Sequence, residues 1–255
     1  MKKMQNSKEQ EQQLIIMGKN PVMEALSSER SINKIYLAEG MQKGSSQKIV
    51  ALAKEKKVIV QFVPKSKIDQ MAGSSNHQGV VASISAYDYY DIHELLQKIE
   101  QKETAPFLLI LDELEDPHNL GSIMRTADVT GVDGIIIPKR RSVGLTSTVA
   151  KTSAGAIEYV PVARVTNLAQ TIDLLKEKGY WIVGTDASGK QFYHQVDYQI
   201  PIAIVIGSEG KGMGKLIKDK CDFVVKLPMK GHVNSLNASV AASLLMYEVY
   251  RHRGF

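Results

Sequence analysis

Six short apolar runs between residues 107 and 228 constrain the fold of this chain more than any other feature. They are FLLILDEL, GIIIP, YVPVARV, YWIVGTDA, IAIVIG and FVVKLP. Such runs are typical of parallel strands that are covered by helices on both faces. Helical patterns separate several of them, most clearly in NLGSIMRTADVTG, NLAQTIDLLKEKG and SLNASVAASLLMYEVYRHR. The alternation predicts an α/β fold with a parallel sheet over residues 106–255.

The last helical pattern has an apolar stripe at spacings of four, four and three residues. The stripe consists of Leu236, Val240, Leu244 and Tyr247. Such a stripe is the ordinary mark of a helix that packs along one side.

A second, smaller α/β domain is predicted over residues 14–87. The runs NKIYLA, VIVQFV and QGVVASIS have the character of strands, and SSQKIVALAKEKK and SKIDQMAG that of helices. A further helix is predicted to start at Asn20 and Pro21, because Asn caps helices and Pro is tolerated in the first turn. Residues 1–13 are too polar to be buried and are expected to form a disordered tail. Residues 88–105, which begin near YDYYD and contain a polar helix, are expected to be a linker.

The net charge of +5 is unevenly distributed along the chain. Residues 1–88 carry 13 Lys and Arg against 8 Asp and Glu, whereas residues 89–255 are neutral overall. A positive field of this kind raises the local concentration of a polyanion such as RNA. The alternative is an ordinary solvated surface.

The remaining composition bounds the class of protein and its location. Hydrophobic residues make up 44% and charged residues 23%, as in globular proteins. A single cysteine, Cys221, allows no intramolecular disulfide and fits a reducing compartment, so we expect a cytoplasmic protein. No apolar run approaches the roughly 20 residues that span a bilayer, and the N-terminal segment lacks the apolar core of a signal peptide. We therefore expect no membrane association.

The stretch GSEGKGMGK, residues 207–215, is a glycine-rich loop that follows an apolar run. Lys215 is followed by Leu216, so the loop lacks the Lys-Ser/Thr pair of a Walker A motif. The alternating glycines also fail the dinucleotide fingerprint, which should follow the first strand of its unit. A phosphate site is thus disfavoured, and Glu209 would be misplaced in one.

Two further stretches accompany this loop. In LEDPHNLGSIMRTAD, Asn119 is predicted to cap a helix from Leu120 to about Thr130. In that helix Leu120, Ile123 and Ala127 would face the core, and Arg125 would face solvent or a cleft. In LPMKGHVNSLNASVAAS, Ser235 or Asn237 is predicted to begin a helix. Taken singly, these residues have the character of ordinary caps and surface side chains.

Together the three stretches resemble the three motifs of the SpoU (TrmH-type) family of RNA ribose 2′-O-methyltransferases, in the same order and with similar spacing. The matching positions are Asn119, Gly121 and Arg125, then Gly207 to Gly210, then Pro228, Met229 and Ser235 to Ser239. Within this family, GKNPVMEAL and HQGVVA resemble the bacterial enzymes that methylate a guanosine of 23S ribosomal RNA. Those enzymes carry an N-terminal RNA-binding domain similar to the ribosomal protein L30e.

The resemblance implies a fold, a cofactor and a set of site residues. The fold is a SPOUT domain with a C-terminal trefoil knot, contrary to the general rule against knots. The cofactor is S-adenosylmethionine, and no metal is needed. The implied cofactor-binding residues are Thr185, Gly207, Leu227, Ser235 and Leu236. The implied catalytic residues are Asn119, Arg125, Glu209 and Asn237. The resemblance also implies a homodimer in which the arginine of one subunit completes the site of the other.

The roles within this set can be argued from chemistry. Arg125 is expected to stabilise negative charge on the attacking ribose oxygen rather than to remove its proton, because the guanidinium pKa exceeds about 12. Glu209 is expected to pair with or orient Arg125. The glycines are expected to let the backbone approach the cofactor. Two alternatives stay open: a sister enzyme for another RNA such as transfer RNA, and a ribosomal RNA-binding or assembly protein without catalysis.

Overall fold

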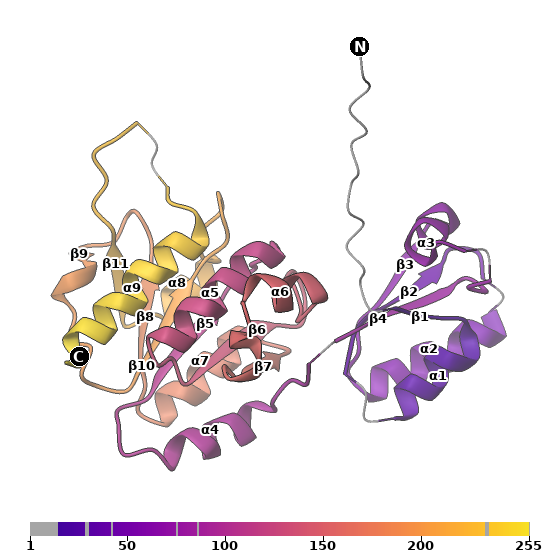
Figure 1. Cartoon of the computed structure of the whole chain (residues 1–255), viewed down its shortest axis with the longest axis horizontal. Coiled ribbons are helices and arrows are strands. Elements are labelled where there is room, and N and C mark those ends of the chain that lie inside the picture. The colour runs from indigo at the N-terminus through magenta and orange to yellow at the C-terminus, as the bar shows by residue number, and fades with distance from the viewer. Residues whose placement is uncertain are drawn as a thin grey trace. The chain divides into compact units, whose positions relative to one another are not determined.

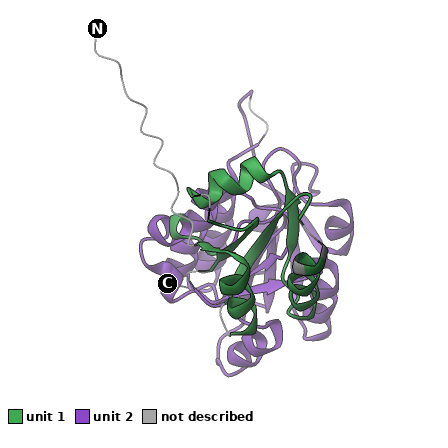
Figure 2. Cartoon of the chain, turned by 90° about the vertical axis from the view of Figure 1, so that its right-hand side faces the viewer, with its two compact units in different colours: residues 1–86, 145–148 green, residues 87–144, 149–255 purple. Residues whose placement is uncertain are grey.

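The computed structural model describes residues 15–28, 31–41, 43–74, 76–85, 87–232 and 235–254. The predicted N-terminal tail lies outside these residues. The chain divides into two compact units, which are coloured separately in Figure 2. Unit 1 comprises residues 1–86 and 145–148, and unit 2 comprises residues 87–144 and 149–255.

The described part of unit 1 contains a mixed sheet of four strands in the order β1-β4-β2-β3. The strands are β1 (Ile15–Met17), β2 (Ile32–Ala38), β3 (Val60–Val63) and β4 (Val80–Ile84). Strand β4 runs antiparallel to both β1 and β2, and only the β2–β3 pair is parallel. The strand β1 was not predicted, because three residues are too short for a periodic pattern.

Three helices cover this sheet, namely α1 (Lys19–Ser27), α2 (Lys43–Glu55) and α3 (Lys65–Ala72). One core contains residues of α1 and α2 with alternate residues of β2 and β4, and a second core contains residues of α3 with Ala38, Val63 and Val81. The predicted start of α1 is wrong in detail. The helix begins at Lys19 after Gly18, whose φ of 95° suits glycine, and no side chain caps it.

The HQGVVA motif joins α3 to β4. His77 is buried, its Nδ1 accepts from the Gly79 amide at 3.0 Å, and its Nε2 lies 2.6 Å from Asp69 Oδ1. Because Nδ1 accepts a hydrogen bond, Nε2 carries the proton and donates to Asp69. His77 therefore has a structural role in this turn.

The described part of unit 2 contains a sheet of seven strands in the order β7-β6-β5-β10-β8-β11-β9. All pairings in this sheet are parallel. The strands are β5 (Phe107–Leu111), β6 (Gly134–Pro138), β7 (Val162–Val165), β8 (Trp181–Thr185), β9 (Gln191–Phe192), β10 (Ile202–Ile206) and β11 (Phe223–Lys226). Six of them lie within the six predicted runs, so the predicted parallel sheet is confirmed.

Helices lie on both faces of this sheet, as Figure 1 shows. The core of one face is formed with α4 (Ile92–Glu100), α7 (Leu168–Glu177) and α8 (Lys215–Lys220). On the other face α5 (Pro117–Val129) and α9 (Ala238–His252) pack against each other, and α9 packs on β10. The short elements α6 (Ser147–Thr152), η1 (Ala156–Glu158) and η2 (Tyr193–Gln195) complete the described structure. The strands are apolar on both faces because helices cover both.

The segment 88–105, expected to be a linker, instead contributes a helix to the core of unit 2. Leu95, Leu96 and Ile99 on α4 are at most 1% exposed and pack with Ile110 and Ile136 of the sheet. Asp91 caps α4 by accepting a hydrogen bond from the His93 amide at 2.8 Å. Ile92 also packs against this core, so the apolar side of α4 has the helical spacing of residues 92, 95, 96 and 99.

Among the described residues, no helix has the length and apolar character needed to cross a membrane.

Candidate active site

The carboxyl ends of three neighbouring parallel strands, β10, β8 and β11, meet at one edge of the unit 2 sheet. The chain leaves β8 at Thr185, β10 at Ile206 and β11 at Lys226, and the segments that follow line a cavity of about 470 Å³. Ligand sites of α/β proteins commonly lie at this edge. All five residues implied as cofactor-binding line this cavity, namely Thr185, Gly207, Leu227, Ser235 and Leu236.

The glycine-rich loop forms one wall of the cavity. Ser208 and Gly212 exchange backbone hydrogen bonds of 3.1 and 2.9 Å, which closes the loop tightly. A Cβ on Gly207 would lie 2.3 Å from backbone atoms of Gly212 and Met213. Gly210 and Gly212 have φ angles of 81° and 67°, which favour glycine. The loop's own closure thus requires a glycine at position 207, and Gly207 also lines the cavity.

A buried carboxylate holds the far end of this loop. Asp112 follows β5 directly, is 6% exposed, and its Oδ2 accepts a hydrogen bond of 2.8 Å from the Gly214 amide. Burial raises the pKa of Asp112, and the hydrogen bond from Gly214 partly opposes the increase. The Asp112 amide donates to the Ile206 carbonyl at 2.8 Å. Asp112 therefore connects the ends of β5 and β10 with the glycine-rich loop.

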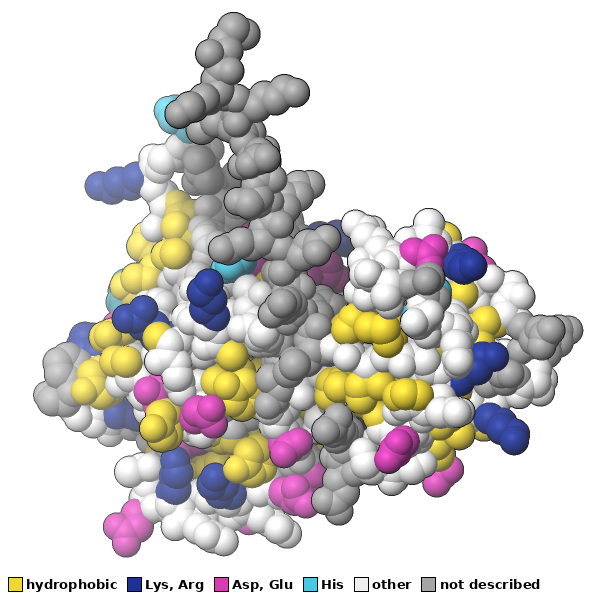
Figure 3. All heavy atoms as spheres, turned by 45° about the vertical axis from the view of Figure 1, so that its right-hand side comes forward, with side chains coloured by type: hydrophobic (Ala, Val, Ile, Leu, Met, Phe, Trp, Pro, Cys, Tyr) yellow, Lys and Arg dark blue, Asp and Glu magenta, His cyan; other side chains and the backbone are white. Residues whose placement is uncertain are grey.

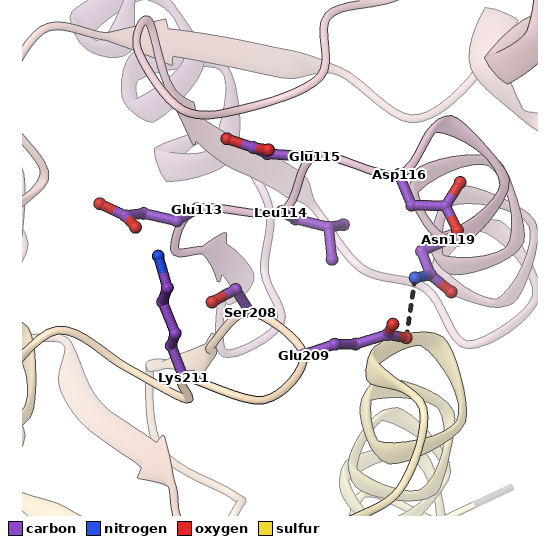
Figure 4. A pocket seen from close by; sticks show the side chains of 8 residues that line it. All are labelled: Glu113, Leu114, Glu115, Asp116, Asn119, Ser208, Glu209 and Lys211. Atoms are coloured by element: carbon purple, nitrogen blue, oxygen red, sulfur yellow. Dashed lines mark hydrogen bonds between the residues drawn. The ribbon is translucent and has the colours of Figure 1, made fainter.

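Glu209 joins the three sequence motifs through a hydrogen-bond network. Its Oε1 accepts from Asn119 Nδ2 at 3.0 Å, from Asn237 Nδ2 at 2.6 Å and from the Ala238 amide at 3.2 Å. Asn237 Nδ2 also donates to Asn119 Oδ1 at 2.9 Å. Figure 4 shows Glu209 reaching Asn119 at the start of α5. Three of the four predicted catalytic residues therefore form one cluster.

The two asparagines occupy different positions in their helices. Asn237 caps α9, and its Oδ1 accepts from the Ser239 amide at 2.9 Å and the Val240 amide at 3.3 Å. The predicted start of this helix is therefore confirmed. Asn119 lies within the first turn of α5 and does not cap it, because Asp116 is the cap and Pro117 precedes it in the helix. Its 4% exposed side chain is thus free to bind Glu209.

Arg125 lies apart from this network. Leu120, Ile123 and Ala127 are fully buried, as predicted, and Arg125 is exposed on the other side of α5. Within the described ranges no hydrogen bond or ion pair reaches Arg125, and it lines neither cavity at the sheet edge. Within one chain Glu209 does not pair with Arg125, because its carboxylate is held by the two asparagines instead. Next to Arg125, the Thr126 and Ser243 hydroxyls lie 3.1 Å apart and join α5 to α9.

A second cavity of about 270 Å³ adjoins the first, and Figure 4 shows its lining. The two cavities share Ser208, Glu209 and Lys211. Three of the other five lining residues are acidic, namely Glu113, Glu115 and Asp116 from the segment between β5 and α5. Glu113 Oε1 accepts from Arg141 Nη1 at 2.8 Å, which neutralises part of this charge. In the part of the chain that the structure describes, no cluster of three His, Cys, Asp or Glu side chains could hold a metal ion.

The apolar stripe of the last helix is exposed to solvent. Val240 is 47%, Leu244 43% and Tyr247 50% exposed, whereas the core side of α9 consists of Ala242, Leu245, Met246 and Val249. The exposed stripe borders a shallow groove of about 270 Å³ that also includes Ser239 and Ser243. The helix thus has two apolar sides, and only one of them is covered within this chain.

Sequence reasoning missed three residues at the sheet edge, namely Asp112, Asp186 and Lys211. Asp112 and Asp186 immediately follow β5 and β8. A polar residue directly after a buried parallel strand is a recognisable signal, because such residues lie at the edge where ligands bind.

Two family models match the chain. The model of the SpoU rRNA Methylase family matches residues 106–247. The model described as RNA 2′-O ribose methyltransferase substrate binding matches residues 15–90. YacO of Bacillus subtilis, whose given name places it in the TrmH family of tRNA/rRNA methyltransferases, is 59% identical over 93% of this chain and 95% of its own length. A Staphylococcus haemolyticus protein of the same family name is also 59% identical, over 94% of this chain and 96% of its own. The chain therefore belongs to the SpoU family of RNA methyltransferases, and its N-terminal substrate-binding domain is present.

Solved structures share its fold. An AdoMet-bound rRNA methyltransferase from Sinorhizobium meliloti has a TM-score of 0.59 at 24% identity, covering 93% of this chain and 87% of its own. The methyltransferase AviRb from Streptomyces viridochromogenes, in complex with AdoMet, has a TM-score of 0.59 at 23% identity, covering 94% and 90%. The TrmH/SpoU tRNA modifying enzyme of A. aeolicus has a TM-score of 0.54 at 27% identity, covering 62% of this chain and 84% of its own.

Proposed function

We propose that this chain transfers the methyl group of S-adenosylmethionine to the 2′-hydroxyl of a guanosine ribose in 23S ribosomal RNA. The observation that carries the proposal is the convergence of the three motifs at the carboxyl edge of the unit 2 sheet. There a cavity lined by the glycine loop adjoins the Asn119–Glu209–Asn237 network. We place this activity in the cytoplasm.

The cavity fits S-adenosylmethionine in size and in chemistry. Its volume of about 470 Å³ lies within the range of small-molecule sites. Apolar side chains such as Val225, Leu227 and Leu236 suit an adenine ring, and the loop backbone suits the polar groups around it. Thr185 Oγ1 donates to the Val205 carbonyl at 3.2 Å, so it fixes the wall of the cavity. We assign cofactor binding to Thr185, Gly207, Leu227, Ser235 and Leu236 on this basis.

The chemistry required of the protein is limited. When bound, S-adenosylmethionine supplies a methyl group that is already activated by the positive sulfonium. The residues of this chain therefore have to orient a ribose hydroxyl and stabilise the charge that develops on its oxygen, and orientation alone is a large factor. Glu209 fixes the amides of Asn119 and Asn237, and these amides in turn position the ribose. Arg125 stabilises the developing negative charge of the 2′-oxygen, because a fixed cation at that atom lowers the barrier.

The position of Arg125 supports a homodimer with a shared site. Arg125 is exposed, has no partner among the described residues and lies outside the cavity of its own chain. The uncovered apolar side of α9 supplies a surface of the kind that a second copy would bury. We propose that two chains associate through this surface and that each provides Arg125 to the site of the other. We also propose that the C-terminal segment is threaded as a trefoil knot, as in other members of the SPOUT superfamily.

Unit 1 is proposed to dock the RNA as an L30e-like domain. Its match to a substrate-binding family model and the positive excess of residues 1–88 support this role. Figure 3 shows one face of the whole chain, on which Lys and Arg side chains are dispersed among apolar and acidic ones. A dispersed positive field attracts RNA without forming a single deep site.

The choice of RNA is tested by mapping 2′-O-methyl groups on total RNA from cells that lack this protein. We expect one guanosine of 23S ribosomal RNA to lose its methyl group, and a plasmid copy of the wild-type chain to restore it. Loss at a transfer RNA nucleotide would instead support the second candidate, since the names of the relatives include tRNA as well as rRNA. An unchanged map would indicate a binding or assembly protein without catalysis.

A further inference from the structure

The cavity proposed to bind the cofactor contains a carboxylate for which the three sequence motifs provide no role. Asp186 follows β8 and lines the cavity beside Thr185. Its Oδ1 accepts from the Ser188 amide at 2.8 Å and from Ser188 Oγ at 2.6 Å, and it lies 3.0 Å from Lys218 Nζ. Three donors thus hold one oxygen of this carboxylate.

The second oxygen has a different environment. No donor among the described residues reaches Asp186 Oδ2. This oxygen lies 3.8 Å from the position that a Cβ would occupy on Gly212, and Gly212 lines the same cavity. An oriented acceptor without a partner therefore faces the space between β8 and the glycine loop.

The charges around the cavity indicate what such an acceptor would bind. The Lys218 ammonium neutralises Asp186, so the pair has little attraction for a cation. Glu209, at the end of the cavity beside Asn119, accepts hydrogen bonds from neutral amides and forms no ion pair with any described residue, although Lys211 lines the same cavity. The cationic sulfonium and ammonium groups therefore suit the Glu209 end. A neutral donor suits Asp186, which lies next to the apolar residues Val225 and Leu227.

We propose that Asp186 Oδ2 accepts a hydrogen bond from a neutral donor on the adenosine part of the cofactor, either a ribose hydroxyl or the adenine amine. The inference rests on the proposed cofactor. It makes Asp186 a specificity-determining residue and sets the orientation of the cofactor, with adenosine toward β8 and the sulfonium toward Glu209.

The first test is calorimetric titration of the full chain with S-adenosylhomocysteine. In Asp186→Asn the amide oxygen keeps the contacts to Ser188, so an N–H group replaces the acceptor that faces the cavity. We expect the affinity of Asp186→Asn for S-adenosylhomocysteine to fall roughly tenfold or more. The variant loses a hydrogen bond to a charged acceptor, and its new N–H group faces the N–H or O–H donor of the ligand. Asp197→Asn is the matched control, since Asp197 Oδ1 makes a similar turn contact with the Gln199 amide at 2.9 Å and lies outside the cavity lining. Its affinity should equal that of the wild type, and thermal melting should show both variants folded.

The second test identifies the donor with two analogues of S-adenosylhomocysteine, one without ribose hydroxyls and one without the 6-amino group. The analogue that lacks the true donor should bind wild type and Asp186→Asn equally. Equal binding of S-adenosylhomocysteine to wild type and Asp186→Asn would overturn the proposal. A loss in Asp186→Asn that persists with both analogues would also overturn it. Failure of the wild-type chain to bind S-adenosylhomocysteine would instead contradict the proposed cofactor.

Discussion

The two sheets of this chain differ in where their strands end, and that difference explains where the site lies. In unit 2 every strand pairing is parallel, so β5, β8, β10 and β11 deliver their following segments to one edge. In unit 1 the strand β4 runs against both of its neighbours, so strand ends are divided between two edges. The parallel sheet can therefore gather polar residues from distant parts of the sequence into one cavity. The mixed sheet supplies a stable surface, and we assign chemistry to unit 2 and RNA docking to unit 1.

The largest effect is expected from a side chain that clashes with the backbone inside the glycine loop. In Gly207→Ala the new Cβ would lie 2.3 Å from the backbone of Gly212 and Met213, and backbone atoms cannot move aside as a side chain can. We expect S-adenosylhomocysteine binding to be lost in calorimetry. Gly210→Ala is the control, because its φ of 81° adds strain of only about 1–2 kcal/mol and no atom lies within 4 Å of the added Cβ. Equal binding by the two variants would show that the loop is not the wall of the site.

The next effect separates catalysis from cofactor binding. Arg125→Ala should lower the rate of methyl transfer by about 100-fold or more, as expected for removal of one group that stabilises transition-state charge. Affinity for S-adenosylhomocysteine and the melting temperature should not change, because Arg125 is exposed and lies outside the cavity. Arg140→Ala, at another exposed arginine, should retain full activity. Turnover of Arg125→Ala above a tenth of the wild-type rate would contradict its role.

The division of labour between the units is tested by truncation. A chain that starts at Tyr87 keeps α4 and should still bind S-adenosylhomocysteine. Its affinity for RNA should be lower by about tenfold or more, because the truncation removes the positive excess of unit 1. A chain that starts at Pro106 lacks Leu95, Leu96 and Ile99 and should be strongly destabilised, since each buried side chain contributes about 1.5–3 kcal/mol. Filter binding at two salt concentrations and urea unfolding provide the measurements. Equal RNA affinity of the full chain and the Tyr87 chain would refute docking by unit 1.

The smallest effect concerns the network at Glu209. In Glu209→Ala the side-chain amide of Asn119, a residue that is 4% exposed, loses its hydrogen-bond acceptor. The free energy of unfolding in urea titrations should therefore fall by about 1–3 kcal/mol. Glu209→Gln keeps an acceptor oxygen at this position and should lie closer to the wild type. Equal stability of the two variants would mean that the hydrogen bonds of Glu209 contribute little.

Much of unit 2 was predictable because its strands are buried on both faces and therefore visible as continuous apolar runs. The network was less accessible, because nothing in the sequence shows that Glu209 binds Asn119, 90 positions earlier. The packing of α4 and the exposure of the α9 stripe were missed for a related reason. Periodicity shows that a helix has an apolar side, but it does not show whether the partner of that side is the same chain.

The central claim is that the carboxyl edge of the unit 2 sheet methylates a ribose of RNA. It is tested most directly by incubating the purified full chain with S-adenosylmethionine labelled in its methyl group and RNA from cells that lack the protein. The RNA is then hydrolysed in alkali, because 2′-O-methylation protects the adjacent phosphodiester bond. We expect label in alkali-stable dinucleotides of 23S ribosomal RNA with the wild-type chain, and a rate of labelling lower by about 100-fold or more with Arg125→Ala. Label on a base, or no label in any RNA, would contradict the account.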